Sequence, residues 1–329
     1  MSGTALSPAI ERSPAEGTEA AFSAATALED SGDHAEAFAQ FVRANALCRA
    51  RFPYDGKADE ALFEALRRTF ARDLPLLPDS TITEAPVFVV GLPRTGISLV
   101  HRLLSAHSQL WSAGDLPAMP AAVRQITGDM ARPVLDTQTI AGLAGRSAQA
   151  LGELYITHMR QQSKAQGLRP VDRFAANFLY IGWIVEALPN ASIVCLRRGA
   201  MDSVWSNFRT PFAAGSTDYP WSHDLLDAAR YVLMFQRLMA FWRQRFPGRI
   251  HEISFEHLVI DQEVQTRRML AHCGLPWDPA CHDICDRETK VVSGARQPSR
   301  PRSIGRWHAH ETALADVMEF FLANGIPLD

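Results

Sequence analysis

The stretch VFVVGLPRTGISLV, residues 87–100, constrains the fold more than any other part of the chain. A β-branched run that ends in glycine is typical of a buried strand in a parallel sheet, and apolar residues with helical spacing follow the loop. Residues 91–98 read G-x-x-x-x-G-x-S, the pattern of a nucleotide phosphate-binding loop, except that Ile97 stands where lysine belongs. The motif therefore predicts a strand, a phosphate-binding loop and a helix, in that order.

The missing lysine changes what this loop can bind. In nucleoside triphosphatases the lysine reaches the β- and γ-phosphates, which Ile97 cannot do. The backbone amides from Thr95 to Ser98, together with the start of the next helix, can still hold a 5′-phosphate. Arg94 adds a planar cation at the tip of the loop. Such a site suits a nucleotide whose reacting group is handled by basic side chains without a metal, and a P-loop kinase is the less favoured alternative.

Other segments repeat the alternation of strand and helix. Strands that alternate with helices of ten or more residues indicate an α/β fold with a P-loop-type parallel sheet flanked by helices. Two further strand–helix units are predicted, with strands at 192–196 and within 248–259 and with helices from about 201 and over 261–275. Two more segments are predicted to be helices that cover the sheet, at 117–165 and 221–246.

The N-terminal part of the chain has a different pattern. Residues 1–18 are rich in Ser, Pro, Glu and Gly and are expected to be disordered. Residues 19–72 form a helical extension, in which Ala37, Phe41 and Ala44 share one face after a turn at Gly32. This pattern is similar to one tetratricopeptide helix pair.

A lone helix pair must pack its apolar face on a neighbour. The extension is therefore either a helical hairpin packed on the main domain or an independent peptide-binding module. It is also a candidate surface for homodimerisation or for a protein partner. Residues 73–86 contain three prolines and form the linker, and residues 87–329 form the main domain.

Composition excludes several classes of protein. A net charge of −3 argues against nucleic-acid binding. No stretch approaches the roughly 20 apolar residues of a membrane span, and we expect no secretory signal in the polar N-terminus. Five cysteines indicate a reducing compartment, so we expect a cytoplasmic protein. The segment 272–285 contains His and Cys residues, but their spacing fits no common zinc site. We expect these residues to pack rather than to bind a metal.

Three motifs in order give the chain a recognisable family likeness. VGLPRTGISLVHRLLSAHS is followed by CLRRGAMDSVWSNF and by SIGRW. This series, within residues 20–325, resembles the sulfotransferase family, whose members use 3′-phosphoadenosine 5′-phosphosulfate. The likeness is greatest to bacterial members with tetratricopeptide-type N-terminal helices, and protein-tyrosine sulfotransferases are more distant relatives. The resemblance implies metal-independent, in-line transfer of a sulfuryl group to a hydroxyl, with a carboxylate as base.

The resemblance also implies roles for three catalytic residues. Arg94 would face the bridging oxygen of the leaving group. Asp115 stands at the position of the family's glutamate base, although it could instead cap the helix that starts near residue 117. Arg173, in DRFAANFLY, replaces the family's lysine and would neutralise the transferring group. Its alternative role is to pair with Asp172 or another carboxylate.

A second group of residues would bind the nucleotide. Arg198 and Ser206 are eight residues apart, as in the family's 3′-phosphate motif, and this spacing selects Arg198 over Arg197. The turn at Gly199-Ala200 departs from the family's Asp-Pro. The complete set of nucleotide-binding residues that the resemblance implies is Arg94, Thr95, Gly96, Ile97, Ser98, Arg198, Ser206, Arg209, Ser293, Arg296 and Arg306.

The acceptor is expected to be a hydroxyl-bearing small molecule or peptide, such as a phenol, sugar or alcohol. Its pocket would be formed by residues of 117–165 and 208–222. If Asp115 is not the base, the alternatives are His101, His107 or a residue of 208–222. The departures from the family motifs leave a non-catalytic nucleotide-binding scaffold as the alternative function.

Overall fold

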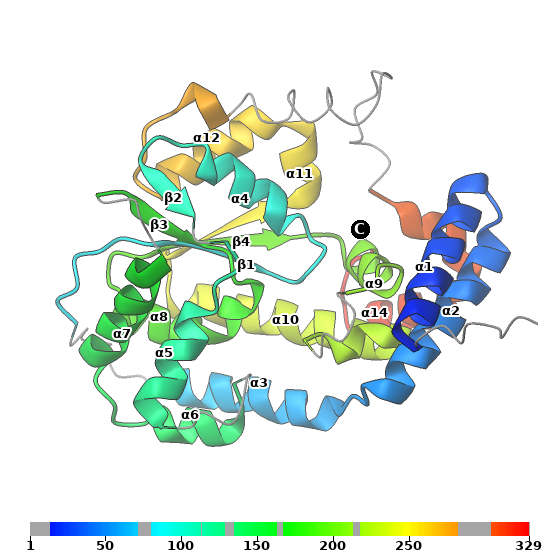
Figure 1. Ribbon diagram of the computed structural model, residues 1–329, viewed down its shortest axis with the longest axis horizontal. Coiled ribbons are helices and arrows are strands. Elements are labelled where there is room, and N and C mark those ends of the chain that lie inside the picture. The colour runs from blue at the N-terminus through cyan, green and yellow to red at the C-terminus, as the bar shows by residue number, and fades with distance from the viewer. Residues whose placement is uncertain are drawn as a thin grey trace, which may run out of the picture.

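The computed structural model contains a five-stranded parallel sheet with strand order β2-β3-β1-β4-β5 (Figure 1). The strands are β1 Val87–Gly91, β2 Leu110–Ser112, β3 Arg169–Asp172, β4 Ser192–Arg197 and β5 Ile250–Ser254. The described residues are 14–71, 80–112, 114–128, 135–162, 167–212, 218–281 and 304–328. The predicted α/β fold with a parallel sheet is confirmed, and so are the three predicted strands β1, β4 and β5.

The two strands that sequence analysis did not predict lie side by side at one edge of the sheet. β2 has three residues and β3 has four, and the register places Trp111 opposite Pro170. Neither shows a run of alternating or β-branched residues long enough to indicate a strand. Their pairing with each other, and that of β3 with β1, makes them strands.

Alternate residues of β1 point to the two faces of the sheet. Val87 and Val89 belong to the core on one face of the sheet, while Phe88 and Val90 belong to the larger core on the opposite face. This alternation follows from the two-residue period of a strand. The helices on the first face are α4 Ile97–Ser105, α11 Phe255–Ile260 and α12 Gln262–His272. Figure 1 shows these three helices above the sheet and, below it, α5 (Ala118–Thr127), α7 (Ala148–Gln162), α8 (Ile181–Ala187) and α10 (Leu225–Arg245).

The remaining elements belong to the second face and to the C-terminal part of the chain. The α-helices are α5 Ala118–Thr127, α6 Thr137–Leu143, α7 Ala148–Gln162, α8 Ile181–Ala187, α9 Ala200–Phe208, α10 Leu225–Arg245 and α14 Ala315–Ala323. The 3-10 helices are η1 Ala175–Tyr180, η2 Pro220–His223, η3 Pro279–Cys281 and η5 Arg306–Leu314. No helix among the described residues is both long enough and apolar enough to cross a membrane.

Three helices precede the sheet: α1 Pro14–Ser31, α2 His34–Arg51 and α3 Gly56–Phe70. α1 starts inside the tail that we expected to be disordered over residues 1–18, because proline is well tolerated in the first turn of a helix. The turn predicted at Gly32 is confirmed: Gly32 has a φ of 90°, and the Asp33 side chain accepts a hydrogen bond from the Glu36 amide. This contact caps α2.

The N-terminal helices share the core of the main domain. Phe22 and Phe41 are buried, and the Phe41 ring lies edge-on to Trp205 of α9 with centroids 5.6 Å apart. The side chain of Asn45 donates a hydrogen bond to the Phe208 carbonyl over 2.7 Å. Of the two arrangements considered for the extension, the structure contains the hairpin packed on the main domain.

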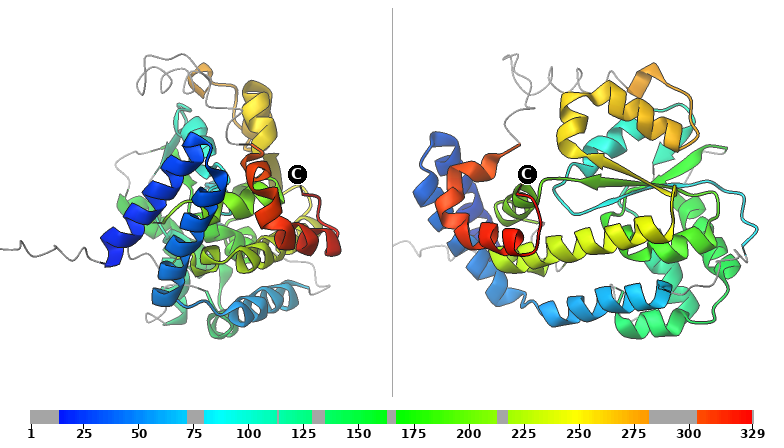
Figure 2. Two further views of the ribbon diagram at one scale, coloured as in Figure 1. Left: turned by 90° about the vertical axis from the view of Figure 1, so that its right-hand side faces the viewer. Right: turned by 180° about the vertical axis from the view of Figure 1, so that it is seen from behind.

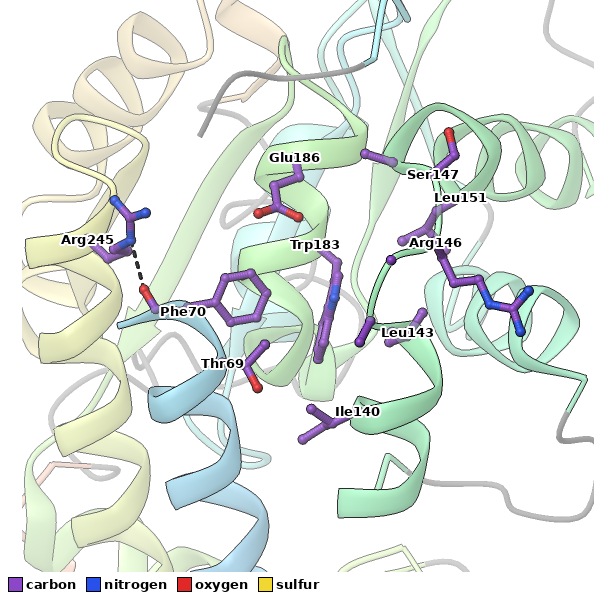
Figure 3. A pocket seen from close by; sticks show the side chains of 13 residues that line it. Thr69, Phe70, Ile140, Leu143, Arg146, Ser147, Leu151, Trp183, Glu186 and Arg245 are labelled. Atoms are coloured by element: carbon purple, nitrogen blue, oxygen red, sulfur yellow. Dashed lines mark hydrogen bonds between the residues drawn. The ribbon is translucent and has the colours of Figure 1, made fainter. Parts of the chain in front are cut away.

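Helix α3 is anchored at its C-terminus by an aromatic contact (Figure 3). The Phe70 ring lies 5.0 Å from Trp183 and 5.1 Å from Trp242, measured between centroids. A Cβ atom at Gly182 would lie 2.3 Å from this ring, so only glycine permits the close approach. Arg245 Nε donates to the Phe70 carbonyl over 2.8 Å, beside a cavity of about 180 Å³. Residues between Ile140 and Leu151, within the segment predicted to form the acceptor pocket, line this cavity, but none of the predicted catalytic or nucleotide-binding residues does.

Candidate functional site

The predicted functional residues meet at the carboxyl edge of the sheet. In parallel α/β sheets, ligands bind outside the carboxyl ends of the strands. The phosphate-binding loop follows β1, Asp115 follows β2, Arg173 follows β3 and Arg198 follows β4. Since the strand order is β2-β3-β1-β4-β5, the loop lies between the Asp115–Arg173 pair on one side and Arg198 on the other.

The two glycines of the loop are required by close contacts. A Cβ atom at Gly91 would lie 2.7 Å from the Leu196 carbonyl oxygen of the neighbouring strand. Gly96 has a φ of 99°, and a Cβ atom there would lie 2.5 Å from the Phe255 ring. The buried Thr95 hydroxyl donates to the Leu92 carbonyl over 2.6 Å and closes the loop.

Helix α4 begins directly after the loop, at Ile97. The first amides of a helix have no acceptor within the helix, and the helix dipole makes this end attractive to anions. Ser98 is exposed in the same turn. This geometry can hold a phosphate group, whereas Ile97 offers no cation for a γ-phosphate.

Arg94 has an unusual backbone conformation. Its φ of 61° is the only positive φ of a non-glycine residue in the described part of the chain. Such conformations are unfavourable and cluster at functional sites. The exposed side chain donates to the Pro211 carbonyl over 2.9 Å, and its guanidinium lies 5.2 Å from the centre of the Phe212 ring. Arg94 therefore connects the phosphate-binding loop to the segment that follows α9.

Asp115 and Arg173 form an ion pair of 2.8 Å between the ends of β2 and β3. The Asp115 side chain is 66% exposed, and that of Arg173 is 24% exposed. The alternative role of Asp115 as the cap of the following helix is wrong, because the N-cap of α5 is Pro117. Asp115 is thus a solvent-accessible carboxylate beside a cation.

Arg173 pairs with Asp115 rather than with its neighbour Asp172. Asp172 is buried and accepts hydrogen bonds of 2.9 Å from the Phe174 amide and from the Asn177 side chain. Burial raises the pKa of Asp172 to about 7 despite these two hydrogen bonds. Its side chain fixes the turn after β3, and that turn directs Arg173 toward the site.

The two histidines considered as alternative bases have other contacts. His107 Nδ1 accepts a hydrogen bond from the Gln109 amide, and Nε2 lies 3.0 Å from the Pro276 carbonyl. His101 Nε2 contacts the hydroxyl of Ser112. Burial, with the positive charges of Arg173 and Arg102, lowers the pKa of His101 to about 4. Of Asp115, His101 and His107, Asp115 is the most accessible to solvent.

Arg198 lies under the phosphate-binding loop. Its Nη1 donates to the Arg94 carbonyl over 2.9 Å, and its guanidinium is 4.9 Å from the centre of the Phe255 ring. Its Nη2 is 3.7 Å from Asp202, which is also buried. Ser206, half-buried, is on α9 one turn after Asp202. Ser206 therefore lies on the same face of α9 as Asp202, the residue that contacts Arg198.

The model of the sulfotransferase family matches residues 86–279, more than half of the chain. The chain belongs to the sulfotransferase family. The matched region includes the phosphate-binding loop, the Asp115–Arg173 pair and Arg198.

Individual relatives of this sulfotransferase-family chain are distant. A protein from Aquifex aeolicus (strain VF5), described only as uncharacterised, is 26% identical over 302 residues. That alignment covers 89% of the chain and 40% of the relative, so the chain spans about two fifths of the relative's length.

Solved structures show a weaker likeness. The sulfotransferase domain of the Synechococcus PCC 7002 olefin synthase is 17% identical with a TM-score of 0.48, covering 74% of the chain and 97% of that domain. The sulfotransferase domain from the curacin biosynthetic pathway is 16% identical with a TM-score of 0.44, covering 68% of the chain and 83% of that domain.

Four residues predicted to bind the nucleotide remain, and the structure describes two of them. Arg209 ends α9 and Arg306 begins η5, and both pair with Glu29 of α1. Ser293 and Arg296 lie outside the described residues. The same is true of part of the segment 272–285, and no group of three metal-ligating side chains occurs among the residues that are described.

Two residues that contact the predicted site residues or their loop were not identified from the sequence. The Asn207 side chain donates to the Pro93 carbonyl over 3.0 Å and ties α9 to the loop. Its position next to Ser206 is a signal that could have identified it. Glu29 lies far from every motif, and nothing in the local sequence marks it.

Proposed function

We propose that this chain transfers a sulfuryl group from 3′-phosphoadenosine 5′-phosphosulfate to a hydroxyl acceptor. The observation that carries the proposal is the arrangement of cations around a phosphate-binding loop without lysine. The loop follows β1, with Arg173 at the end of β3 on one side and Arg198 at the end of β4 on the other. These cations suit an anionic nucleotide handled without a metal.

In the proposed complex, the loop amides and the start of α4 hold the 5′-phosphate of the donor. Arg198 and Ser206 hold the 3′-phosphate, the first through charge-assisted hydrogen bonds. The acceptor oxygen attacks sulfur, the bond from sulfur to the bridging oxygen breaks, and the bisphosphate nucleotide leaves. Arg94 stabilises the negative charge that develops on the bridging oxygen.

Asp115 takes the acceptor's proton as general base in this proposal. Two observations support the role: the carboxylate is accessible to a substrate, and it is not needed to cap α5. Arg173 holds Asp115 at 2.8 Å and supplies positive charge beside the sulfuryl group. The proton therefore has an acceptor that is part of the chain.

Residues 87–329 would form the transferase domain, with 19–72 as a helical extension that completes its core. The same proposal covers the activity of the whole protein and the nature of its acceptor, which would be a small molecule or a peptide. Because the Aquifex aeolicus relative is much longer than the chain, we assign the transfer reaction to this segment alone.

The proposal is tested first by nucleotide binding. The product, 3′-phosphoadenosine 5′-phosphate, should raise the melting temperature through preferential binding to the folded state, and ATP at the same concentration should raise it much less. Transfer from radiolabelled donor to a mixture of phenols, sugars, alcohols and peptides should then continue in millimolar EDTA. Equal stabilisation by ATP, or activity that EDTA abolishes, would favour a P-loop kinase instead.

A further inference from the structure

A buried carboxylate from the N-terminal extension lies among the nucleotide-binding arginines. Glu29, in the last turns of α1, has a side chain that is only 3% exposed. It pairs with Arg209 at the end of α9 and lies 3.0 Å from Arg306 at the start of η5. These partners are 180 and 277 residues away in sequence. Figure 2 shows α1 beside the C-terminal segment that begins with η5.

This carboxylate is charged in the folded protein. Burial alone would raise the pKa of Glu29, but a hydrogen bond from His310 and the positive charges of Arg209 and Arg306 lower it to about 2. His310 Nε2 donates to Glu29 Oε1 over 3.4 Å. The result is a buried carboxylate held between two guanidinium groups, in which each member depends on the others for charge compensation.

The same two arginines lie beside the proposed 3′-phosphate subsite. Arg209 follows Ser206 by three residues, about one helical turn. The Gly305 amide donates to Asp202 over 2.7 Å and so fixes Arg306 next to α9. Burial lowers the pKa of Arg198, and the positive charges of Arg209 and Arg306 lower it further. Three guanidinium groups therefore gather on one side of the phosphate-binding loop.

We infer that Glu29 is a positioning residue for the nucleotide: it orients Arg209 and Arg306 toward the 3′-phosphate, so that the N-terminal extension completes the site. The inference rests on the proposed function. Long arginine side chains lose considerable rotamer freedom when they are fixed, and a site organised in advance binds its ligand more tightly. A carboxylate between the two arginines removes that cost before the nucleotide arrives.

The test compares two nucleotides by titration calorimetry: 3′-phosphoadenosine 5′-phosphate and adenosine 5′-monophosphate, which lacks the 3′-phosphate. Glu29→Gln keeps the size of the side chain and removes its charge. We expect affinity for the bisphosphate to fall about tenfold or more, with affinity for the monophosphate changed less than about threefold. Asp30→Asn is the matched control, because Asp30 also contacts Arg306, at 3.3 Å, but is 65% exposed. Its affinities for both nucleotides should equal those of the unmodified chain.

The direction of the change separates the possible roles of Glu29. A purely structural role would weaken binding of both nucleotides equally, and a role as a competing anion would increase affinity for the bisphosphate; either result overturns the inference, as does no change. If the unmodified chain does not distinguish the two nucleotides, the proposed function itself fails.

A measurement on the unmodified chain keeps the inference testable if Glu29→Gln does not fold. Amide hydrogen exchange reports local opening. The bisphosphate should slow exchange in the last turns of α1, around residues 26–31, and the monophosphate should not. Equal exchange in α1 with the two nucleotides bound would overturn the inference.

Discussion

Replacement of Arg198 by alanine tests the nucleotide site most directly. The side chain is 7% exposed and holds three neighbours: the Arg94 carbonyl at 2.9 Å, Asp202 at 3.7 Å and the Phe255 ring at 4.9 Å. A phosphate oxygen would be held by the same guanidinium through a charge-assisted contact. Arg198→Ala removes that contact and one support of the loop that carries Arg94.

The loss can be estimated from these contacts. A charge-assisted hydrogen bond contributes about 1.5–3 kcal/mol, which corresponds to about a 10- to 150-fold weaker affinity. The substitution also leaves Asp202 with fewer partners, although the Gly305 amide still donates to it over 2.7 Å. An incompletely paired buried group costs about 1–3 kcal/mol, so we also expect a lower melting temperature.

Titration calorimetry with 3′-phosphoadenosine 5′-phosphate measures the affinity, and Arg197→Ala is the matched control. Arg197 is adjacent in β4 but pairs with Glu252 of β5 over 3.3 Å, away from the loop. Arg197→Ala should leave affinity for the nucleotide unchanged. Unchanged affinity in Arg198→Ala, with a loss in Arg197→Ala, would refute the assignment and the spacing argument behind it.

Three further results are expected. Asp115→Asn should lower turnover of the acceptor on the order of 100-fold or more, since an amide cannot take up the proton. The melting temperature should change little, because the ion pair of Asp115 with Arg173 is exposed. A wild-type rate of turnover would exclude Asp115 as the base. Gly96→Ala should weaken binding of the bisphosphate nucleotide in calorimetry, because the new methyl group would overlap the Phe255 ring and the φ of 99° disfavours alanine; unchanged affinity would contradict the description of the loop. Asp172→Asn should raise the melting temperature at pH 8 but not at pH 4, and equal shifts at both would contradict the prediction. The buried Asp172 carboxyl has a folded pKa of about 7, above its unfolded value, so its contribution to stability is full below about pH 4 and is lost as pH rises through 7.

The strand–loop–helix unit around residues 87–100 could be predicted because its signals are local. A β-branched run, two glycines and helical spacing each act within a few residues, and β1, the loop and α4 follow them. The spacing of Arg198 and Ser206 is also a local signal, because both residues lie in one strand–helix unit. By contrast, β2 and β3 could not be predicted, since their few residues become strands only by pairing with each other and with β1.

The class of fold and the residue types available to the site follow from local sequence patterns. Hydrophobic periodicity and turn chemistry are properties of neighbouring residues, and they are present before the chain folds. Which charged side chains meet, by contrast, depends on how the strands and helices pack. Asp115 pairs with Arg173 because β2 and β3 are adjacent in the sheet, and the N-cap of α5 is Pro117, which excludes the helix-cap role that the local sequence had left open for Asp115. Glu29 reaches Arg209 and Arg306 because α1 packs beside α9 and η5. Contacts between residues so distant along the chain depend on the packing of whole elements, which no local pattern specifies.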